Sequence, residues 1–200
     1  MNKPFLRPLV AATAMALAAS ASAADPSWMV RVRAIDVEPD ASSSIAGLDV
    51  KGQWAPELDF TYFFTKNLAA ELILATTRHE VTLNGTSLGK VSVLPPTLAL
   101  QYHFTDFGAF QPYVGGGLNL TWFYNDGLQL PNGTKLGVDS TSVGGALQGG
   151  FDWEIAKNWF FNVDVKYIWM STDVTLPGGA NLTNLKINPW VYGIGIGYRF

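Results

Sequence analysis

The chain has 200 residues and a formal net charge of −3, and only 14% of its residues are charged. It has no cysteine, which excludes a disulfide framework and thiolate chemistry. Because acidic residues outnumber basic ones, the composition does not indicate nucleic acid as a partner. The 20 glycines and the 13% of aromatic residues are typical of a membrane β-barrel.

The first 23 residues predict a secretory signal peptide. Lys3 and Arg7 precede the apolar stretch Leu9–Ala19, and Ala21-Ser-Ala23 fits a cleavage site of small residues. Cleavage takes the formal charge from −3 to −5 because it removes these two cations. The remaining residues, 24–200, are enough for one domain. No other window approaches the roughly 18 consecutive apolar residues of a transmembrane helix.

Eight segments of the mature chain alternate apolar with other residues, which predicts eight β-strands. The expected strands are 28–37, 54–64, 68–80, 96–104, 111–124, 142–154, 159–171 and 187–200. A hairpin through Asn84-Gly85 is expected to project past the membrane. Long and short connections alternate, and in outer-membrane barrels the short turns are periplasmic. The predicted fold is therefore all-β: an eight-stranded antiparallel transmembrane β-barrel of the bacterial outer-membrane type, with both termini in the periplasm.

The last strand shows the alternation most clearly. Every even position from Trp190 to Phe200 is large and apolar or aromatic, whereas the odd positions from Gly193 to Arg199 are Gly or Arg. A terminal Phe with aromatic or apolar residues two, four and six places before it resembles the signal by which outer-membrane barrels are recognised for insertion. Phe200 is therefore expected to bind the barrel-assembly machinery.

The tryptophans favour a barrel whose apolar face contacts outer-membrane lipid. All seven share the parity of the apolar face, and they fall near the two ends of the strands. Those expected at the periplasmic side are Trp28, Trp153 and Trp159, and those at the opposite side are Trp54, Trp122, Trp169 and Trp190. Membrane–water interfaces favour such belts. A lipocalin-like soluble barrel, with the same face turned inward, is the alternative.

With the apolar face outward, the other face fills the lumen, ionic near the periplasm and apolar above. The predicted polar plug consists of Arg31, Arg33, Glu57, Asp59, Glu71, His103, Asp152, Asp164, Lys166 and Arg199. The predicted hydrophobic lumen consists of Ile35, Val37, Ile73, Ala75, Phe123, Ile168, Met170 and Val191. An eight-stranded barrel is barely wide enough for its own side chains, so the charges must pair. The upper apolar residues form either a binding pocket or simply the upper core.

Several motifs resemble the outer-membrane protein W (OmpW) family across the mature chain. They are Asn67-Leu-x-x-Glu-Leu-x-x-Ala-Thr76, Leu94-Pro-Pro-Thr-Leu98 with Gln101-Tyr102, Pro112-Tyr-Val-Gly-x-Gly-x-Asn119, and Asn188-Pro-Trp-Val191 with Gly197-Tyr-Arg-Phe200. The resemblance implies a hydrophobic cavity that passes small hydrophobic molecules inward and releases them through the wall. Lys166 departs from the family pattern, in which a large apolar residue is expected.

The predicted function is an outer-membrane channel for small hydrophobic molecules. An apolar lumen captures them because each Å² of apolar surface removed from water contributes about 25 cal/mol. Pro95 and Pro96 remove two backbone donors and predict a lateral opening, while the polar plug closes the periplasmic end. The alternative is a structural or adhesive receptor barrel that acts through its extracellular loops, such as 125–140.

Catalysis is not expected. A lipase-like enzyme would need His103 as a base, but no nucleophile motif accompanies it. His79 and His103 are the only histidines and no cysteine is present, so neither a metal site nor a cofactor is predicted.

Overall fold

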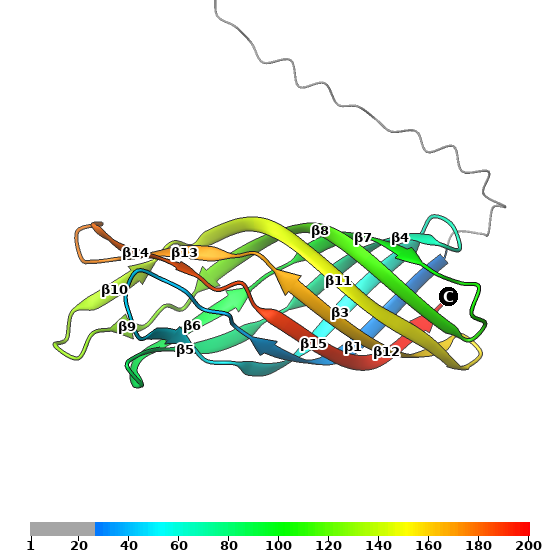
Figure 1. Ribbon diagram of the computed structural model, residues 1–200, viewed down its shortest axis with the longest axis horizontal. Helices are drawn as coiled ribbons and strands as arrows, with labels where there is room; N and C mark the ends of the chain where they lie inside the picture. The colour runs from blue at the N-terminus through cyan, green and yellow to red at the C-terminus, as the bar shows by residue number, and fades with distance from the viewer. Residues whose placement is uncertain (1–26) are drawn as a thin grey trace, which may run out of the picture.

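The computed structural model describes residues 27–200, so the predicted signal peptide at 1–23 lies outside the described part. The described chain forms a closed antiparallel barrel with eight wall strands and no helix (Figure 1). The wall comprises β1 (Ser27–Glu38), β3 (Gln53–Phe63), β4 (Leu68–Ala75) with β5 (Thr77–Leu83), β6 (Thr86–Leu94) with β7 (Thr97–His103), β8 (Phe110–Tyr124), β11 (Thr141–Ala156), β12 (Trp159–Ile168) and β15 (Trp190–Arg199). Pairing of β11 with β8 closes the sheet. The predicted fold class is confirmed.

Five short strands extend the long connections, which the sequence predicted as loops. They are β2 (Leu48–Val50), β9 (Leu128–Gln129), β10 (Lys135–Val138), β13 (Ser171–Thr175) and β14 (Asn181–Lys186). The last four form a second sheet, and it lies at the end of the barrel opposite the C-terminus (Figure 1). The β5–β6 hairpin also projects at this end, and Asn84 and Gly85 take the positive φ angles that a tight hairpin turn needs.

Three wall strands differ most from the prediction. The fourth begins at Thr86 rather than at 96, because the β5–β6 hairpin extends the wall beyond Pro95 and Pro96. The third wall strand continues to Leu83 but is interrupted at Thr76, between β4 and β5. The eighth begins at Trp190 rather than at 187, because Asn188 has a φ of 36° and Pro189 cannot donate to a ladder. Within residues 27–200, no helix has the length and apolar character required to cross a membrane.

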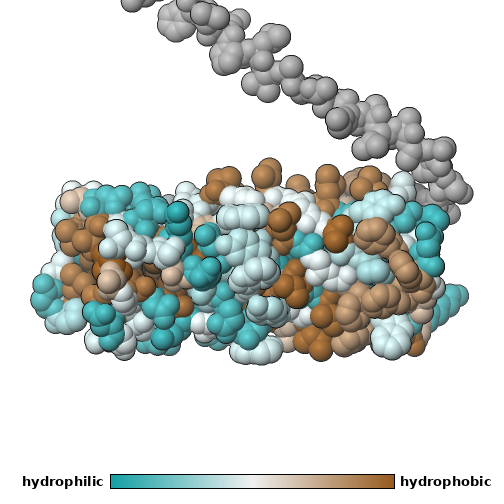
Figure 2. Space-filling view, in the orientation of Figure 1, coloured by the Kyte–Doolittle hydropathy of each residue, from teal (hydrophilic) through white to brown (hydrophobic). Residues whose placement is uncertain are grey.

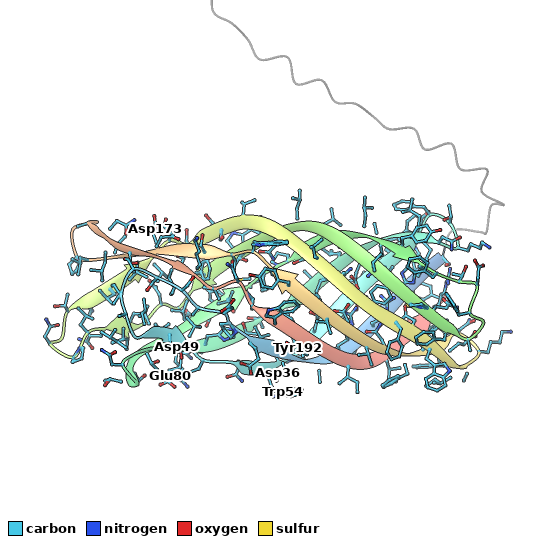
Figure 3. The ribbon with its side chains drawn as sticks, viewed as in Figure 1. Asp36, Asp49, Trp54, Glu80, Asp173 and Tyr192 are labelled. Carbon is cyan, nitrogen blue, oxygen red and sulfur yellow. The ribbon has the colours of Figure 1, made fainter. Side chains whose placement is uncertain are left out.

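The apolar face of the wall points outward, as the membrane interpretation requires. Leu118 and Val143 are 72% and 77% exposed, and all seven tryptophans are exposed. Figure 2 shows apolar side chains gathered over the wall and hydrophilic ones toward both ends of the molecule. The outer aromatic belt contains Trp54, Trp122, Trp169 and Trp190, at the side opposite the termini. Within this belt, Asp36 of β1 lies between its ladder partners Trp54 of β3 and Tyr192 of β15 (Figure 3). A soluble barrel would have the opposite arrangement.

The alternate glycines of β15 make room for two arginines on β1. A Cβ added at Gly195 would lie 2.2 Å from the Val32 carbonyl oxygen and 2.8 Å from Cγ of Arg33. One added at Gly197 would lie 2.9 Å from Cγ of Arg31. The inward face of β15 is therefore bare because the arginine stems of its neighbour lie across it.

Candidate functional site

Arg31, on β1, occupies the centre of the lower lumen. It holds Asp152 of β11 with two hydrogen bonds, Nε to Oδ1 at 3.0 Å and Nη2 to Oδ2 at 2.7 Å. Its Nη1 donates to Asp59 of β3 at 2.9 Å and to Thr61 at 2.7 Å. All four side chains are buried. A planar guanidinium suits this arrangement because its donors are fixed in a fork that matches a carboxylate.

Arg33, two residues further along β1, gathers the remaining carboxylates of the lumen. It donates to Glu57 at 2.9 Å, to Asp59 at 2.5 Å and to Glu71 at 2.7 Å, with Asp164 at 3.4 Å. Alternate positions of β1 thus link β3, β4 and β12 across the barrel. Such buried charges are tolerated only because each has partners of opposite sign.

Lys166 lies at the top of this cluster, on β12. Its Nζ donates to Glu57 Oε1 at 3.0 Å and to Asp164. The ammonium therefore reaches toward the ion pairs, while the side chain and Glu57 form the floor of the cavity above. The floor of the cavity is therefore polar at the position where the resemblance predicted a large apolar residue.

Two of the predicted plug residues, His103 and Arg199, differ from the rest in their contacts. His103 is buried with its Nε2 3.0 Å from Gln101 Oε1 and its Nδ1 3.8 Å from Asp152. Arg199 forms no ion pair among the described residues. Its Nε donates to Ser27 Oγ at 2.8 Å, and the guanidinium lies 3.9 Å from the centre of the Phe63 ring. Arg199 therefore lies outside the ion-pair network, which corrects its assignment, because strand parity gives the face of a residue but not its neighbours.

Neutral polar side chains complete the cluster, and the charge-based selection of plug residues did not include them. Gln101 and Gln148 each donate to Glu71 Oε2 at 2.7 Å. Tyr113 donates to Asp164 at 2.9 Å, and Asn162 donates to Asp152 at 2.9 Å. Their inward parity in the strand pattern is the signal that could have found them.

An apolar cavity lies directly above the polar cluster. The space inside it that the centre of a water-sized sphere can reach is about 60 Å³. All eight residues predicted for the hydrophobic lumen line it. The extracellular strands add apolar residues that the sequence did not single out, namely Val50, Val81, Val91, Leu128, Val138 and Leu185. The strands of the long connections thus continue the wall of the cavity beyond the eight predicted residues.

The wall beside the cavity is interrupted at the predicted lateral opening. Ladder pairing runs to Ile73↔Thr97 between β4 and β7 and resumes at Thr77↔Val93 between β5 and β6. The positions between, 74–76 and 94–96, form no ladder pair with each other, and Pro95 lines the cavity. On its other side this segment is bonded to β8, since the Leu120 amide donates to the Pro96 carbonyl at 3.0 Å.

His79 of β5 lines the extracellular part of the cavity, beyond the outer aromatic belt. Its Nδ1 donates to the Lys51 carbonyl at 2.8 Å, and its Nε2 lies 2.8 Å from Thr77 Oγ1. Burial lowers the pKa of this imidazole below its usual value of 6.5, against the opposing influences of the Lys51 carbonyl and Glu38.

We therefore expect His79 to titrate below pH 6.5. The ring is then neutral in the folded state at neutral pH, and its contribution to stability is present above 6.5 and lost as the pH falls below it. The measurement is an NMR titration of the imidazole Cε1–H signals, with a His79→Asn variant to assign the resonance. A midpoint at or above 6.5 would contradict the expectation.

A closed eight-stranded barrel with an apolar exterior, two aromatic belts and an ionic interior defines the class of bacterial outer-membrane barrels. The family model described as "OmpW family" matches residues 25–200, and the chain belongs to that family. The protein therefore resides in the bacterial outer membrane and contacts its lipid.

Curated relatives and a solved structure agree with this assignment. The chain is 46% identical to the uncharacterized outer-membrane protein y4mB of Sinorhizobium fredii, over 86% of this chain and 80% of the relative. It is 35% identical to outer membrane protein W of Escherichia coli, over 78% of each chain. The crystal structure of the outer membrane protein OprG from Pseudomonas aeruginosa is similar with a TM-score of 0.77 and 32% identity, over 87% of this chain and 95% of that one.

Proposed function

We propose that this protein is a channel through which small hydrophobic molecules enter the outer membrane. A solute enters the apolar cavity from the extracellular side, leaves sideways through the wall near Pro95 and Pro96, and does not cross the polar cluster below. The observation that carries the proposal is the position of a cavity lined mainly by apolar side chains directly above a lumen filled with ion pairs.

The energetics favour capture in the cavity and exit through the wall. Transfer of a solute from water into the cavity contributes about 25 cal/mol for each Å² of apolar surface buried. Passage downward would require separating buried ion pairs, and breaking such a pair costs about 3–5 kcal/mol. Exit through the gap between 74–76 and 94–96 requires no such separation of ion pairs.

Replacing Ile73 or Ile168 with Asp tests the channel. Each change places a carboxylate in the apolar cavity, and we expect uptake of an apolar fluorescent probe to fall by about tenfold or more because an unpaired carboxylate there retains water. Uptake would be measured in proteoliposomes with N-phenyl-1-naphthylamine. Gln129→Asp, at an exposed position of β9, adds the same charge outside the cavity and is the control.

Barrel assembly in each variant is checked by the heat-dependent shift in gel mobility that folded barrels show. Uptake that survives both substitutions in folded protein would contradict the channel and favour a barrel that acts through its extracellular loops.

We also propose how the protein is exported and assembled, and that it is not an enzyme. Residues 1–23 direct export and are cleaved, and Phe200 is recognised by the barrel-assembly machinery. The protein needs no cofactor and carries no catalytic residue, and its relatives are named as outer-membrane proteins rather than enzymes.

A further inference from the structure

The floor of the cavity offers one hydrogen-bond acceptor and one donor side by side. Glu57 Oε1 accepts from both Arg33 Nη1 at 2.9 Å and Lys166 Nζ at 3.0 Å, whereas Oε2 accepts no hydrogen bond from the described residues. The Lys166 ammonium has three donors and uses two of them, on Glu57 and Asp164.

Glu57 of β3 and Lys166 of β12 meet across the floor of the cavity. Both residues line the cavity, and so do their ladder partners, Ala75 for Glu57 and Val191 for Lys166. An alkane lying against the floor would leave an acceptor and a donor unpaired in an apolar surrounding, which is unfavourable.

The charge of the polar cluster decides which head group fits. Three permanent cations face five carboxylates. The cations are Arg31, Arg33 and Lys166, and the carboxylates are Glu57, Asp59, Glu71, Asp152 and Asp164. An anionic head group would add to the excess of negative charge in a medium of low dielectric constant. An ammonium would have no lone pair for the Lys166 donor.

We propose that Glu57 and Lys166 form a head-group subsite and that the cavity prefers neutral single-chain amphiphiles with a terminal hydroxyl. The hydroxyl donates to Glu57 Oε2 and accepts from Lys166 Nζ, while the alkyl chain extends upward along Ile73 and Ile168. This inference rests on the proposed channel and names the class of solute that the channel takes.

A series of ligands with ten carbons tests the subsite on the unmodified protein in lipid nanodiscs. Decane, 1-decanol, decanoate and decylammonium would compete with N-phenyl-1-naphthylamine, with empty nanodiscs correcting for partition into lipid. We expect 1-decanol to displace the probe at about tenfold lower concentration than decane, because only the alcohol forms hydrogen bonds to the two charged groups, and tenfold corresponds to about 1.4 kcal/mol. Decanoate and decylammonium should be weaker than the alcohol.

A variant tests whether the preference for 1-decanol depends on the floor of the cavity. Lys166→Met keeps the length of the side chain and removes the donor, so the ratio between 1-decanol and decane should fall toward one. Lys135→Met, at an exposed position of β10, should keep the ratio of the unmodified protein.

The outcomes separate this inference from the channel itself. If decane and 1-decanol displace the probe equally from the unmodified protein, the subsite is overturned and the channel stands. If decanoate is the strongest competitor, the subsite selects an anion and the inference is also overturned. If no ligand displaces the probe, the proposed channel fails with it.

Discussion

Replacing Arg33 with Met is expected to lower the free energy of unfolding by about 3–5 kcal/mol, the range measured when one partner of a buried ion pair is removed. The guanidinium contacts Glu57, Asp59 and Glu71, and all three carboxylates are buried. Methionine keeps an unbranched stem that can lie against Gly195, so the loss reports the charge rather than a cavity.

The measurement is equilibrium unfolding by urea in lipid vesicles, followed by tryptophan fluorescence. Arg78→Met removes an exposed arginine from β5 and should change stability by no more than about 0.5 kcal/mol. A loss below about 1 kcal/mol for the Arg33 variant would mean that the network does not depend on this cation.

Replacing Gly195 with Leu is expected to prevent the first and last strands from pairing. The new Cβ would lie 2.2 Å from the Val32 carbonyl oxygen, so the β1–β15 ladder must shift, and the branched side chain would compete with the Arg33 stem. We expect a loss of more than about 3 kcal/mol, at the upper end for overpacking, because backbone as well as side chain must move.

The folded fraction after refolding into vesicles, measured by gel mobility without heating, reports this effect. Gly127→Leu is the matched control, since no atom lies within 4 Å of its added Cβ. A Gly195 variant that folds as fully as this control would show that the seam tolerates a side chain.

The sequence predicted the wall well because alternation is a local signal. Inward and outward faces differ at every second residue, so Val32 and Leu118 could be placed outside and Arg31 inside from parity alone. The Asn84-Gly85 dipeptide indicated the projecting hairpin correctly. The strands of the long connections were missed because they are two to six residues long and pair with distant segments, as β10 does with β13.

The candidate site was predicted only in part, for a related reason. Parity identifies the residues that face the lumen, but contacts between them depend on the tilt of the strands and on side-chain reach. Arg199 was therefore assigned to an ion network that it does not join, and Tyr113, a neutral partner of Asp164, was omitted. Leu128 and Leu185 entered the cavity lining through long-range packing of the loops, which no local pattern encodes.

The ion network draws its members from both halves of the chain, since Arg31 of the first strand binds Asp152 of the sixth wall strand. A barrel in which only some strands have paired would leave a guanidinium or a carboxylate facing hydrocarbon without its counter-charge. These unpaired charges make incomplete barrels electrostatically unfavourable in the membrane. The ion network of the lumen therefore favours insertion only when the barrel is closed.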